Sequence, residues 1–508
     1  MNRTQTQTPH PTTAGHVPGG GTGAGAGAGT GAGGGSADLL IVDADIVTMA
    51  PGREVVTGGA IAIVDGRIAD IGPAGALRVA YRHPPELDAA GCLVVPGLID
   101  AHQHTTADPL IRSSIPDHVP AQQAIFDWIV PLHAAVTGDD DELSATLTAV
   151  EALSYGVTTL LEPGTVAHPL RVAAGLRTAG IRGRVGRWGW DTPDAPYAMP
   201  AADTLAAQAE TVTALAGDPL VTGWITLVGH DLVSDELFTG AAELAERLDV
   251  PMTWHLSPSA DDPAAYAVAG RPRPVLHLRD LGVLGPRLLL GHAVWLDDDE
   301  LDVLAASGAA VASCPGAYLR LGQGFTRAGR HTELLRAGGR LALGCDSHNA
   351  GDVPDVWQAA RLFAGLDRDR GAVDPLRADE VFALATIDGA TAVGLGQLTG
   401  SIEVGKAADL VVLDTRTVAW TPGGDLATQL VWGAASHTVR DVLVDGRPVI
   451  RDRRITGVDV DALRTEAMRR RADLLRRAGI DIPHRWPAVP ATEYRAHRTG
   501  PAGATPPQ

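Results

Sequence analysis

The stretch Val94-Val95-Pro96-Gly97-Leu98-Ile99-Asp100-Ala101-His102-Gln103-His104 decides the fold of this chain. Its apolar run predicts a buried strand, and the strand ends in two histidines spaced i, i+2. Because alternate side chains of a strand point to the same face, both imidazoles leave the strand end in one direction. Two histidines presented in this way predict a metal site, and the rest of the chain tests that prediction.

Apolar strands alternate with amphipathic helical stretches over residues 96–397. The sequence predicts eight strands, at Leu93–Ile99, Val157–Leu161, Arg182–Gly186, Trp224–Val228, Pro251–Trp254, Leu288–Leu290, Ala309–Ser313 and Arg340–Leu343. Helices are predicted between most of them, such as Ser234–Leu248, which opens on a favoured N-cap residue. Eight βα units in about 300 residues predict an α/β fold, a (β/α)8 TIM-type barrel. A doubly wound open sheet is the alternative, but no Gly-rich phosphate loop follows any strand.

Short alternating strands flank this central domain on both sides. Asp65-Gly66-Arg67 and Asp445-Gly446-Arg447 each lie between apolar runs and predict hairpin turns. Because the same Asp-Gly-Arg turn occurs in both flanking segments, we expect residues 38–95 and 398–455 to form one small β-sandwich module. A C-terminal helix and tail are expected at 456–508. Residues 1–37 are Thr/Pro-rich and then almost pure Gly/Ala, which predicts a disordered tail.

The composition limits the compartment and the partners. Of the 508 residues, 45% are hydrophobic and 20% are charged, which is typical of a globular protein. No apolar run reaches the ~18 residues that span a bilayer, and no signal-peptide pattern opens the chain. Three widely spaced cysteines in apolar contexts favour a reduced, cytoplasmic protein. The net charge of -19 argues against nucleic-acid and membrane partners and leaves a small molecule as the expected substrate.

Lysine occurs only once, as Lys406, among 41 basic residues. Catalysis that needs a lysine elsewhere in the chain is therefore excluded. This removes Schiff-base chemistry, and it removes binuclear metal sites that a carboxylated lysine bridges.

Metal-ligating residue types end four of the predicted strands. His102 and His104 end the first, His255 the fifth, His292 the sixth, and Asp346 the eighth. In a TIM-type barrel these ends converge on one mouth. Histidines with a carboxylate suit one divalent metal, Zn²⁺ first and Fe²⁺ second, with a position left for water. The metal would lower the pKa of that water towards ~7.

Together these residues resemble the amidohydrolase superfamily, in its mononuclear branch of cytosine, guanine and S-adenosylhomocysteine deaminases and triazine hydrolases. The resemblance covers about residues 37–463 and includes, besides the opening stretch, Gly156-Val157-Thr158-Thr159, Gly291-His292-Ala293-Val294-Trp295-Leu296-Asp297, Ser313-Cys314-Pro315, Leu319-Arg320-Leu321-Gly322, Gly344-Cys345-Asp346 and Gly400-Ser401-Ile402-Glu403-Val404-Gly405-Lys406-Ala407-Ala408-Asp409-Leu410.

The resemblance implies a role for each of these residues. It implies that the metal ligands are His102, His104, His255 and Asp346. By the same resemblance His292 would polarise the substrate or the bound water, and Asp346 would also take a proton from that water. The implied enzyme is a hydrolase that breaks a non-peptide C–N bond of a small cyclic or heteroaromatic molecule, and the family often forms homodimers or higher oligomers.

One position departs from the deaminases of this branch. They carry a proton-transferring glutamate three residues after the strand-5 histidine, and here that position is Pro258. General acid help is typically worth ~10²–10⁴ in rate, so its loss matters. Either another group has taken over or the reaction differs, for example a dechlorination, a ring opening or a non-hydrolytic step. A catalytically silent binding protein is the alternative from another class, and a metal assay separates it.

Several residues could replace that carboxylate or contact the substrate. The candidates are Glu162, Asp231 beside His230, Asp261 and His348. For Glu162 and Asp261 a capping or solvated carboxylate is the favoured alternative. His230 is better placed, because the family often has a substrate-contacting histidine after strand 4.

Aromatic residues near the strand ends complete the predicted substrate pocket. Trp188 and Trp190 stand i, i+2 and predict a flat aromatic wall, with core packing as an equal alternative. Trp295 follows His292 and is a further predicted contact, whereas Trp254 is expected to point away from the site. After strand 7 the branch often has His-Cys-Pro, and the Ser313-Cys314-Pro315 found here predicts a reshaped pocket.

Overall fold

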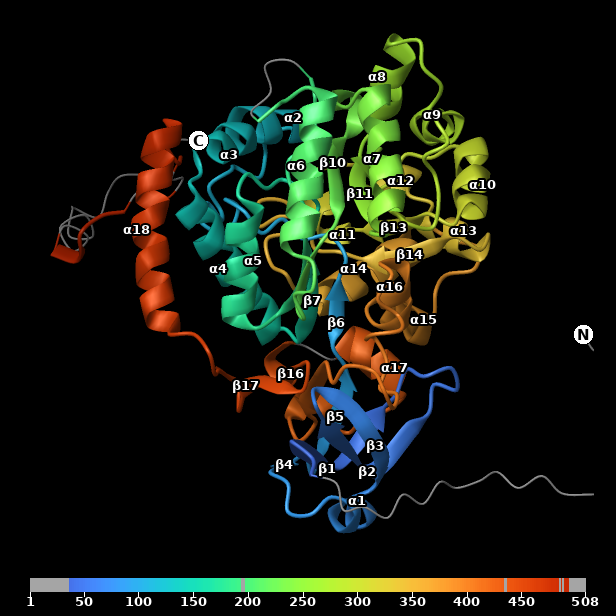
Figure 1. Ribbon diagram of the computed structural model, residues 1–508, viewed down its shortest axis with the longest axis vertical. Helices are drawn as coiled ribbons and strands as arrows, with labels where there is room; N and C mark the ends of the chain where they lie inside the picture. The colour runs from blue at the N-terminus through green and yellow to red at the C-terminus, as the bar shows by residue number, and fades with distance from the viewer. Residues whose placement is uncertain (1–35, 193–196, 434–435, 484–485, 487, 493–508) are drawn as a thin grey trace, which may run out of the picture.

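The computed structural model describes residues 36–192, 197–433, 436–483, 486 and 488–492. The predicted disordered tail lies outside these residues apart from Ser36 and Ala37. Figure 1 shows two parts, a helix-covered domain of parallel strands and a smaller sheet at one end of it.

The parallel strands of the larger domain lie in two sheets that adjoin at both edges. One holds β6 (Leu98–Asp100), β7 (Val157–Leu161), β8 (Arg182–Val185) and β9 (Val221–Gly223); the other holds β10 (Ile225–Gly229), β11 (Met252–Leu256), β12 (Leu288–His292), β13 (Ala310–Ser313) and β14 (Arg340–Leu343). Only Trp224 separates β9 from β10, and its N–H donates to Val185 O at 3.3 Å. At the other edge the Ala101 N–H donates to Leu343 O at 2.9 Å. With β9 and β10 counted as one interrupted strand, the order is that of the eight predicted βα units.

The first predicted strand, Leu93–Ile99, is wrong as a single strand. It is divided into β5 (Cys92–Pro96), which pairs with β15 (Leu410–Asp414) near the other end of the chain, and β6, which pairs with β7. Gly97 separates them, and its N–H donates to Asp409 O at 2.9 Å. The apolar run is continuous because both halves are buried, although they belong to different sheets.

Helices cover the outside of the parallel strands (Figure 1). They are α4 (Gly138–Ser154), α5 (Pro169–Ala179), α6 (Ala201–Ala214), α7 (Asp235–Leu248), α8 (Asp261–Val268), α9 (Pro274–Asp280), α10 (Asp298–Ser307), α11 (Pro315–Arg320), α12 (Phe325–Ala328), α13 (His331–Arg336), α14 (Val356–Asp369), α15 (Ala378–Leu384) and α16 (Ile387–Ala392). The prediction for α7 is confirmed, since the Leu237 N–H donates to Ser234 Oγ at 3.1 Å. Phe238 of α7 packs on Trp254, so this tryptophan points into the strand–helix core as expected.

Strands from both chain ends pair in one nine-stranded sheet. Its strands are β1 (Leu39–Val47), β2 (Val55–Val64), β3 (Arg67–Pro73), β4 (Glu86–Asp88), β5, β15 (Leu410–Asp414), β16 (Val439–Val444), β17 (Arg447–Arg451) and β18 (Arg454–Ile455). Both predicted hairpin turns are present, and positive φ angles of 48° at Asp65 and 49° at Asp445 match the turn type that Asp-Gly favours. That both ends build one sheet agrees with the predicted module; its sandwich form stays a prediction.

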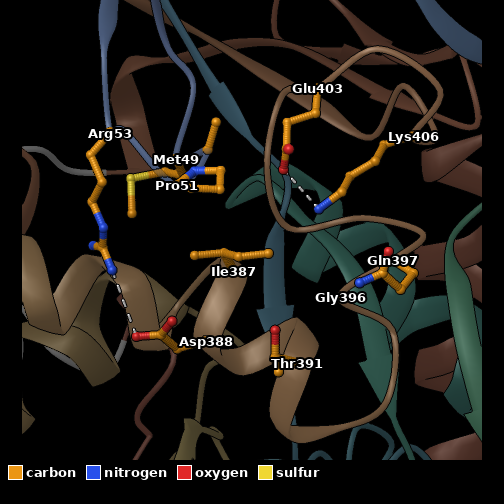
Figure 2. A pocket seen from close by; sticks show the side chains of 11 residues that line it. Met49, Pro51, Arg53, Ile387, Asp388, Thr391, Gly396, Gln397, Glu403 and Lys406 are labelled. Atoms are coloured by element: carbon orange, nitrogen blue, oxygen red, sulfur yellow. Dashed lines mark ion pairs between the residues drawn. The ribbon is translucent and has the colours of Figure 1, made fainter.

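A cavity of about 340 Å³ lies between this terminal sheet and the larger domain. Figure 2 shows opposite charges paired across it: Arg53 faces Asp388, and Lys406 faces Glu403. The Lys406 Nζ lies 3.0 Å from Glu403 Oε1 and donates to Ser401 Oγ at 2.6 Å. Each of these four charged side chains therefore has a partner of opposite charge.

The remaining α-helices are α1 (Ala74–Ala80), α2 (Ala121–Gln123), α3 (Val130–Ala135), α17 (Leu426–Thr428) and α18 (Val460–Ala478). Helix α1 packs on the terminal sheet, at the end of the molecule away from the mouth (Figure 1). Helix α18 lies alongside α3 and α4, and its Arg471 donates to the carbonyls of Leu110 and Arg112 in the loop after β6. Within the described ranges, none of the helices has the length and apolarity that crossing a bilayer requires.

Candidate metal centre

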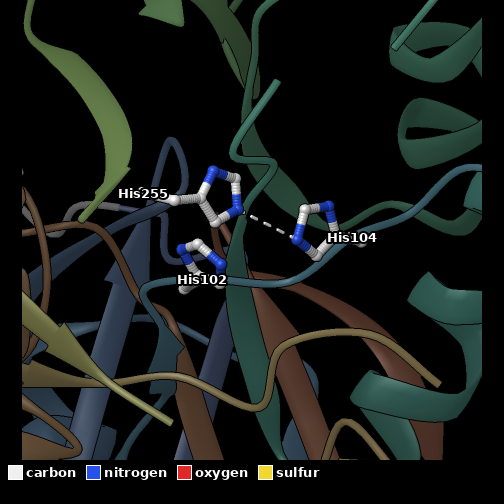
Figure 3. Close-up of side chains that lie close together, drawn as sticks. All are labelled: His102, His104 and His255. Atoms are coloured by element: carbon white, nitrogen blue, oxygen red, sulfur yellow. Dashed lines mark hydrogen bonds between the residues drawn. The ribbon is translucent and has the colours of Figure 1, made fainter. Parts of the chain in front are cut away.

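Five predicted side chains meet at the carboxyl ends of the parallel strands. His102 and His104 follow β6, His255 lies in β11, His292 ends β12, and Asp346 follows β14. None of them is more than 8% exposed. Nε2 of His104 lies 3.3 Å from Nε2 of His255 (Figure 3) and 3.5 Å from Asp346 Oδ1. Ligand atoms within 4.8 Å of one another form two overlapping groups, His102 with His104 and His255, and His102 with His292 and Asp346.

Two glycines leave room for the central histidine. A Cβ on Gly291 would lie 2.7 Å from His102 Cε1, and a Cβ on Gly344 would lie 2.7 Å from His102 Cβ. Larger residues at either position would push His102 out of the group. The glycines that stand directly before His292 and before Cys345-Asp346 are therefore part of the site's construction.

The protonation of these groups suits a cation. Burial and the neighbouring imidazoles lower the pKa of His102, His255 and His292 well below the ordinary value, and burial lowers that of His104 to about 4. These rings are therefore neutral and offer lone pairs at neutral pH. Without a cation beside it, burial raises the pKa of Asp346 to about 7.

Unpartnered atoms give a second test of the fit. Both ring nitrogens of His102 and Nδ1 of His292 are buried and have no hydrogen-bond partner within the part of the chain that the structure describes. Unpaired buried polar atoms cost stability, so such a cluster needs an explanation. Neutral imidazoles together with one carboxylate are a donor set that Zn²⁺ prefers, and the residues present fit a divalent metal.

Neighbouring groups orient the ligand rings. Nδ1 of His255 donates to Val228 O at 2.8 Å, which leaves its Nε2 facing the group. Nδ1 of His104 lies 2.6 Å from Thr165 Oγ1. Glu162 stands behind this threonine and accepts the N–H groups of Thr105 and Gly164 at 2.6 and 3.0 Å.

These contacts match the alternative for Glu162, a carboxylate that organises a loop. Burial raises the pKa of this carboxyl to about 7, although the backbone N–H groups oppose the shift. Its Oε1 lies 4.0 Å from His104 Nδ1, on the side away from Nε2. Its role as a substrate contact stays a prediction.

His230 is held beside the group by a carboxylate that the sequence analysis did not name. Its Nδ1 donates to Asp262 Oδ2 at 2.7 Å, and Oδ2 also accepts the Ser257 N–H at 2.6 Å. The ring stacks on that of His255, with centroids 5.8 Å apart. Burial lowers the pKa of His230, but the Asp262 carboxylate outweighs it and raises the pKa above the ordinary value. Asp262 thus reaches the end of strand 5, where Pro258 offers no titratable group.

The two nearby acidic residues that the sequence predicted as candidates, Asp231 and Asp261, lie at the surface. Asp231 is exposed, and Asp261 is exposed and accepts a hydrogen bond from Ser259 Oγ at 3.0 Å. Asp262 is the second residue of α8, so only its place in the first turn of a helix after strand 5 could have marked it.

The other residues predicted to contact the substrate are in contact with other residues of the chain. Trp188 and Trp190 are buried, and their rings stack with centroids 4.7 Å apart. The Trp295 Nε1–H donates to Gln323 O at 2.7 Å. His348 is buried with Nε2 3.2 Å from Glu151 Oε2. The role of these four residues in substrate binding stays a prediction.

Two further buried residues support the site and had no signal in the sequence pattern. Asp100 accepts the N–H groups of His102 and Cys345 at 3.2 and 3.1 Å and so ties the first strand to the last. His331, from α13, donates to the carbonyl of His292 at 2.7 Å.

Comparison with known proteins agrees with this geometry. A family model described as "Amidohydrolase family" matches residues 93–449. A 5-methylthioadenosine/S-adenosylhomocysteine deaminase of Syntrophobacter fumaroxidans is 33% identical over 428 residues, which are 84% of this chain and 95% of that protein. A deaminase of the same name from Nitratidesulfovibrio vulgaris is 33% identical over 433 residues, again 84% and 95%.

Solved structures share the fold. The crystal structure of an adenosine deaminase from Xanthomonas campestris with bound zinc has a TM-score of 0.81 and 30% identity, and it covers 87% of this chain and 99% of its own. Atrazine chlorohydrolase from Arthrobacter aurescens in complex with zinc has a TM-score of 0.78 at 21% identity, with 86% and 100% covered, which shows the fold alone. These neighbours confirm the TIM-type barrel.

Proposed function

The chain belongs to the amidohydrolase family and is a hydrolase of C–N bonds other than peptide bonds, and from that premise we propose that it deaminates an aminated heterocycle. The observation that carries the proposal is the buried group of neutral imidazoles and one carboxylate at the carboxyl ends of the strands. The deaminase names of the most similar relatives support adenine nucleosides as the first substrates to test.

His102, His104, His255 and Asp346 would hold one divalent metal, zinc before iron, as in the zinc-containing neighbour. When bound, the metal supplies a Lewis acid that makes water nucleophilic near neutral pH. Asp346 accepts the proton of the attacking water. His292 is neutral, and we assign it to the substrate atom beside the sp² carbon, which it orients and polarises.

The leaving nitrogen needs a donor, because an amine leaves poorly without a proton. We assign this place to His230, since Asp262 fixes its Nδ1 and leaves the far edge of the ring for the substrate. In the complete reaction water adds to the ring carbon and the C–N bond breaks. One proton of the water leaves with the amine nitrogen as ammonia, and the other stays on a ring nitrogen of the oxo product. Trp188, Trp190, Trp295 and His348 are proposed to line the pocket.

Pro258 favours a second candidate on the same platform. A dechlorination would not need the glutamate that this position lacks, because chloride leaves without a proton. Ammonia release separates the two proposals, because only deamination produces it. We also propose a homodimer or higher homo-oligomer, which light scattering of the purified protein tests.

The experiment is an ammonia-release screen of zinc-reconstituted protein over adenine nucleosides, other aminated heterocycles and cyclic amides. We expect ammonia from some of the aminated compounds. His255→Ala is expected to abolish metal binding and turnover, whereas the matched variant Pro258→Ala keeps the metal. An inert wild-type protein with full metal would overturn the deaminase proposal, and full metal in His255→Ala would overturn the ligand assignment. A wild-type site that takes up no metal would point to the silent binding protein.

A further inference from the structure

The turn that presents His292 is strained. His292 and Ala293 both adopt positive φ angles, 78° and 47°, although neither is glycine. A residue with a Cβ is strained in this conformation and persists there only where its surroundings impose it. The turn keeps the His292 ring against the group, with its centroid 5.0 Å from that of His102.

Backbone contacts hold one side of this turn. The Ala293 N–H donates to Leu256 O at 2.8 Å, and the N–H groups of Val294 and Trp295 donate to Ser257 O at 3.0 and 3.1 Å. These bonds fix the amide groups to the end of β11. These bonds do not involve the carbonyls of His292 and Ala293, which need another hydrogen-bond donor.

One imidazole supplies that donor. Nε2 of His331 lies 2.7 Å from His292 O and 3.3 Å from Ala293 O. Because a carbonyl can only accept, Nε2 carries the proton, and Nδ1 is left to accept from Ser313 Oγ at 3.0 Å. The hydroxyl of Ser313, which stands where related enzymes often have histidine, thus completes the contacts of the ring.

The His331 ring is locked in this arrangement. It is fully buried at the start of α13, and the ring of Phe325 lies edge-on at 5.1 Å. Burial lowers its pKa to about 4, so at neutral pH it carries a single ring proton. Phe363 stacks on its other side at 6.4 Å. An apolar side chain would fill the same space but would leave two strained carbonyls without this donor.

We propose that His331 is a positioning residue, which holds the strained His292–Ala293 turn so that His292 faces the metal ligands. The proposal rests on the role given to His292 in the proposed function. The ring nitrogens of His331 bond the carbonyls of His292 and Ala293 and the Ser313 hydroxyl, so its effect on His292 passes through the backbone.

The test compares His331→Leu with His331→Gln. Leucine keeps the volume and removes the donor, whereas the glutamine amide can still donate to the carbonyls. We expect His331→Leu to lower kcat by about 10–100-fold, with KM and metal content nearly unchanged, and His331→Gln to recover part of that loss. His277→Leu is the matched control for the exchange experiment below, because His277 is also buried but bonds Asp235 and packs on Tyr266 in place of the His292–Ala293 turn.

Amide hydrogen exchange gives a readout that needs no substrate. In His331→Leu the amides of Ala293, Val294 and Trp295 should exchange faster than in wild type, and in His277→Leu they should not. Unchanged exchange in His331→Leu, or equally faster exchange of the same amides in His277→Leu, overturns the proposal. If the turn loosens while wild type releases no ammonia from any compound, the proposed function fails and the positioning role stands.

Discussion

At the amino end of the barrel the Arg182 guanidinium donates two hydrogen bonds to Asp409, at 2.9 and 3.0 Å, whereas at the carboxyl end both ring nitrogens of His102 lack a partner among the described residues. Arg182 and Asp409 are as deeply buried as the imidazoles. Burying an unpaired polar group costs free energy, and burying a paired ion couple largely offsets its own cost. The paired buried groups at the amino end therefore have a structural role, whereas the unpaired ones at the carboxyl end indicate a functional role.

The amino end also contains the cavity in Figure 2, and its charges are paired as well. Arg53 lies 4.0 Å from Asp388, and Lys406 lies 3.0 Å from Glu403. None of the residues that line this cavity is a histidine, so it lacks a cluster of neutral bases. The unpaired ring nitrogens of His102 and His292 lie at the carboxyl end instead.

The largest effect on turnover is expected from a substitution at the carboxyl end of the barrel, where buried groups lack partners. Asp346→Asn should reduce turnover by about 10²–10⁴-fold, because the amide cannot accept the proton of the attacking water. The melting temperature of the metal-free protein should stay the same or rise, since a buried carboxyl whose pKa burial raises to about 7 is replaced by a neutral group of the same shape. Turnover with excess zinc and thermal unfolding without metal measure the two effects. A large loss of stability would break the comparison.

The opposite result is expected at the amino end. Asp409→Asn removes the buried counter-charge of Arg182 and leaves only the partly exposed Asp445, 3.4 Å from its Nη2, so it should lower the free energy of unfolding by about 3 kcal/mol. Turnover per folded, metal-loaded molecule should not change. Asp414→Asn is the control in the same sheet, because its partner Arg416 is exposed, and it should cost much less. Denaturant unfolding with a zinc assay checks this, and a selective loss of turnover in Asp409→Asn would contradict it.

The sequence predicted the fold where local pattern determines it. The runs Val157–Leu161 and Arg340–Leu343 are strands with the predicted bounds, because each is a short buried stretch within one sheet. The run Leu93–Ile99 was not, since hydrophobicity does not record that Gly97 separates two sheets. A switch between sheets depends on pairing with strands that lie far away in the sequence, such as β15 for β5.

The site divides in the same way. His102, His104 and Asp346 could be found because each directly follows a strand and carries a metal-ligating side chain. Asp262 and His331 could not be found, since they act on His230 and His292 across 32 and 39 residues of sequence. Their partners are set by how α8 and α13 pack against the strand ends. Local spacing carries no record of that packing.

The smallest effect is expected at the amino-end cavity, where Lys406→Met tests whether paired charges there are dispensable. The Lys406–Glu403 pair lies near the surface, and such pairs contribute about 0–1 kcal/mol to stability. Because Lys406 is the only lysine in the chain, this single substitution yields a lysine-free protein. Metal content, turnover and melting temperature should all stay close to wild type. If turnover disappeared while zinc stayed bound, a lysine would be part of the chemistry, and the paired end of the barrel would have a catalytic role that its contacts do not show.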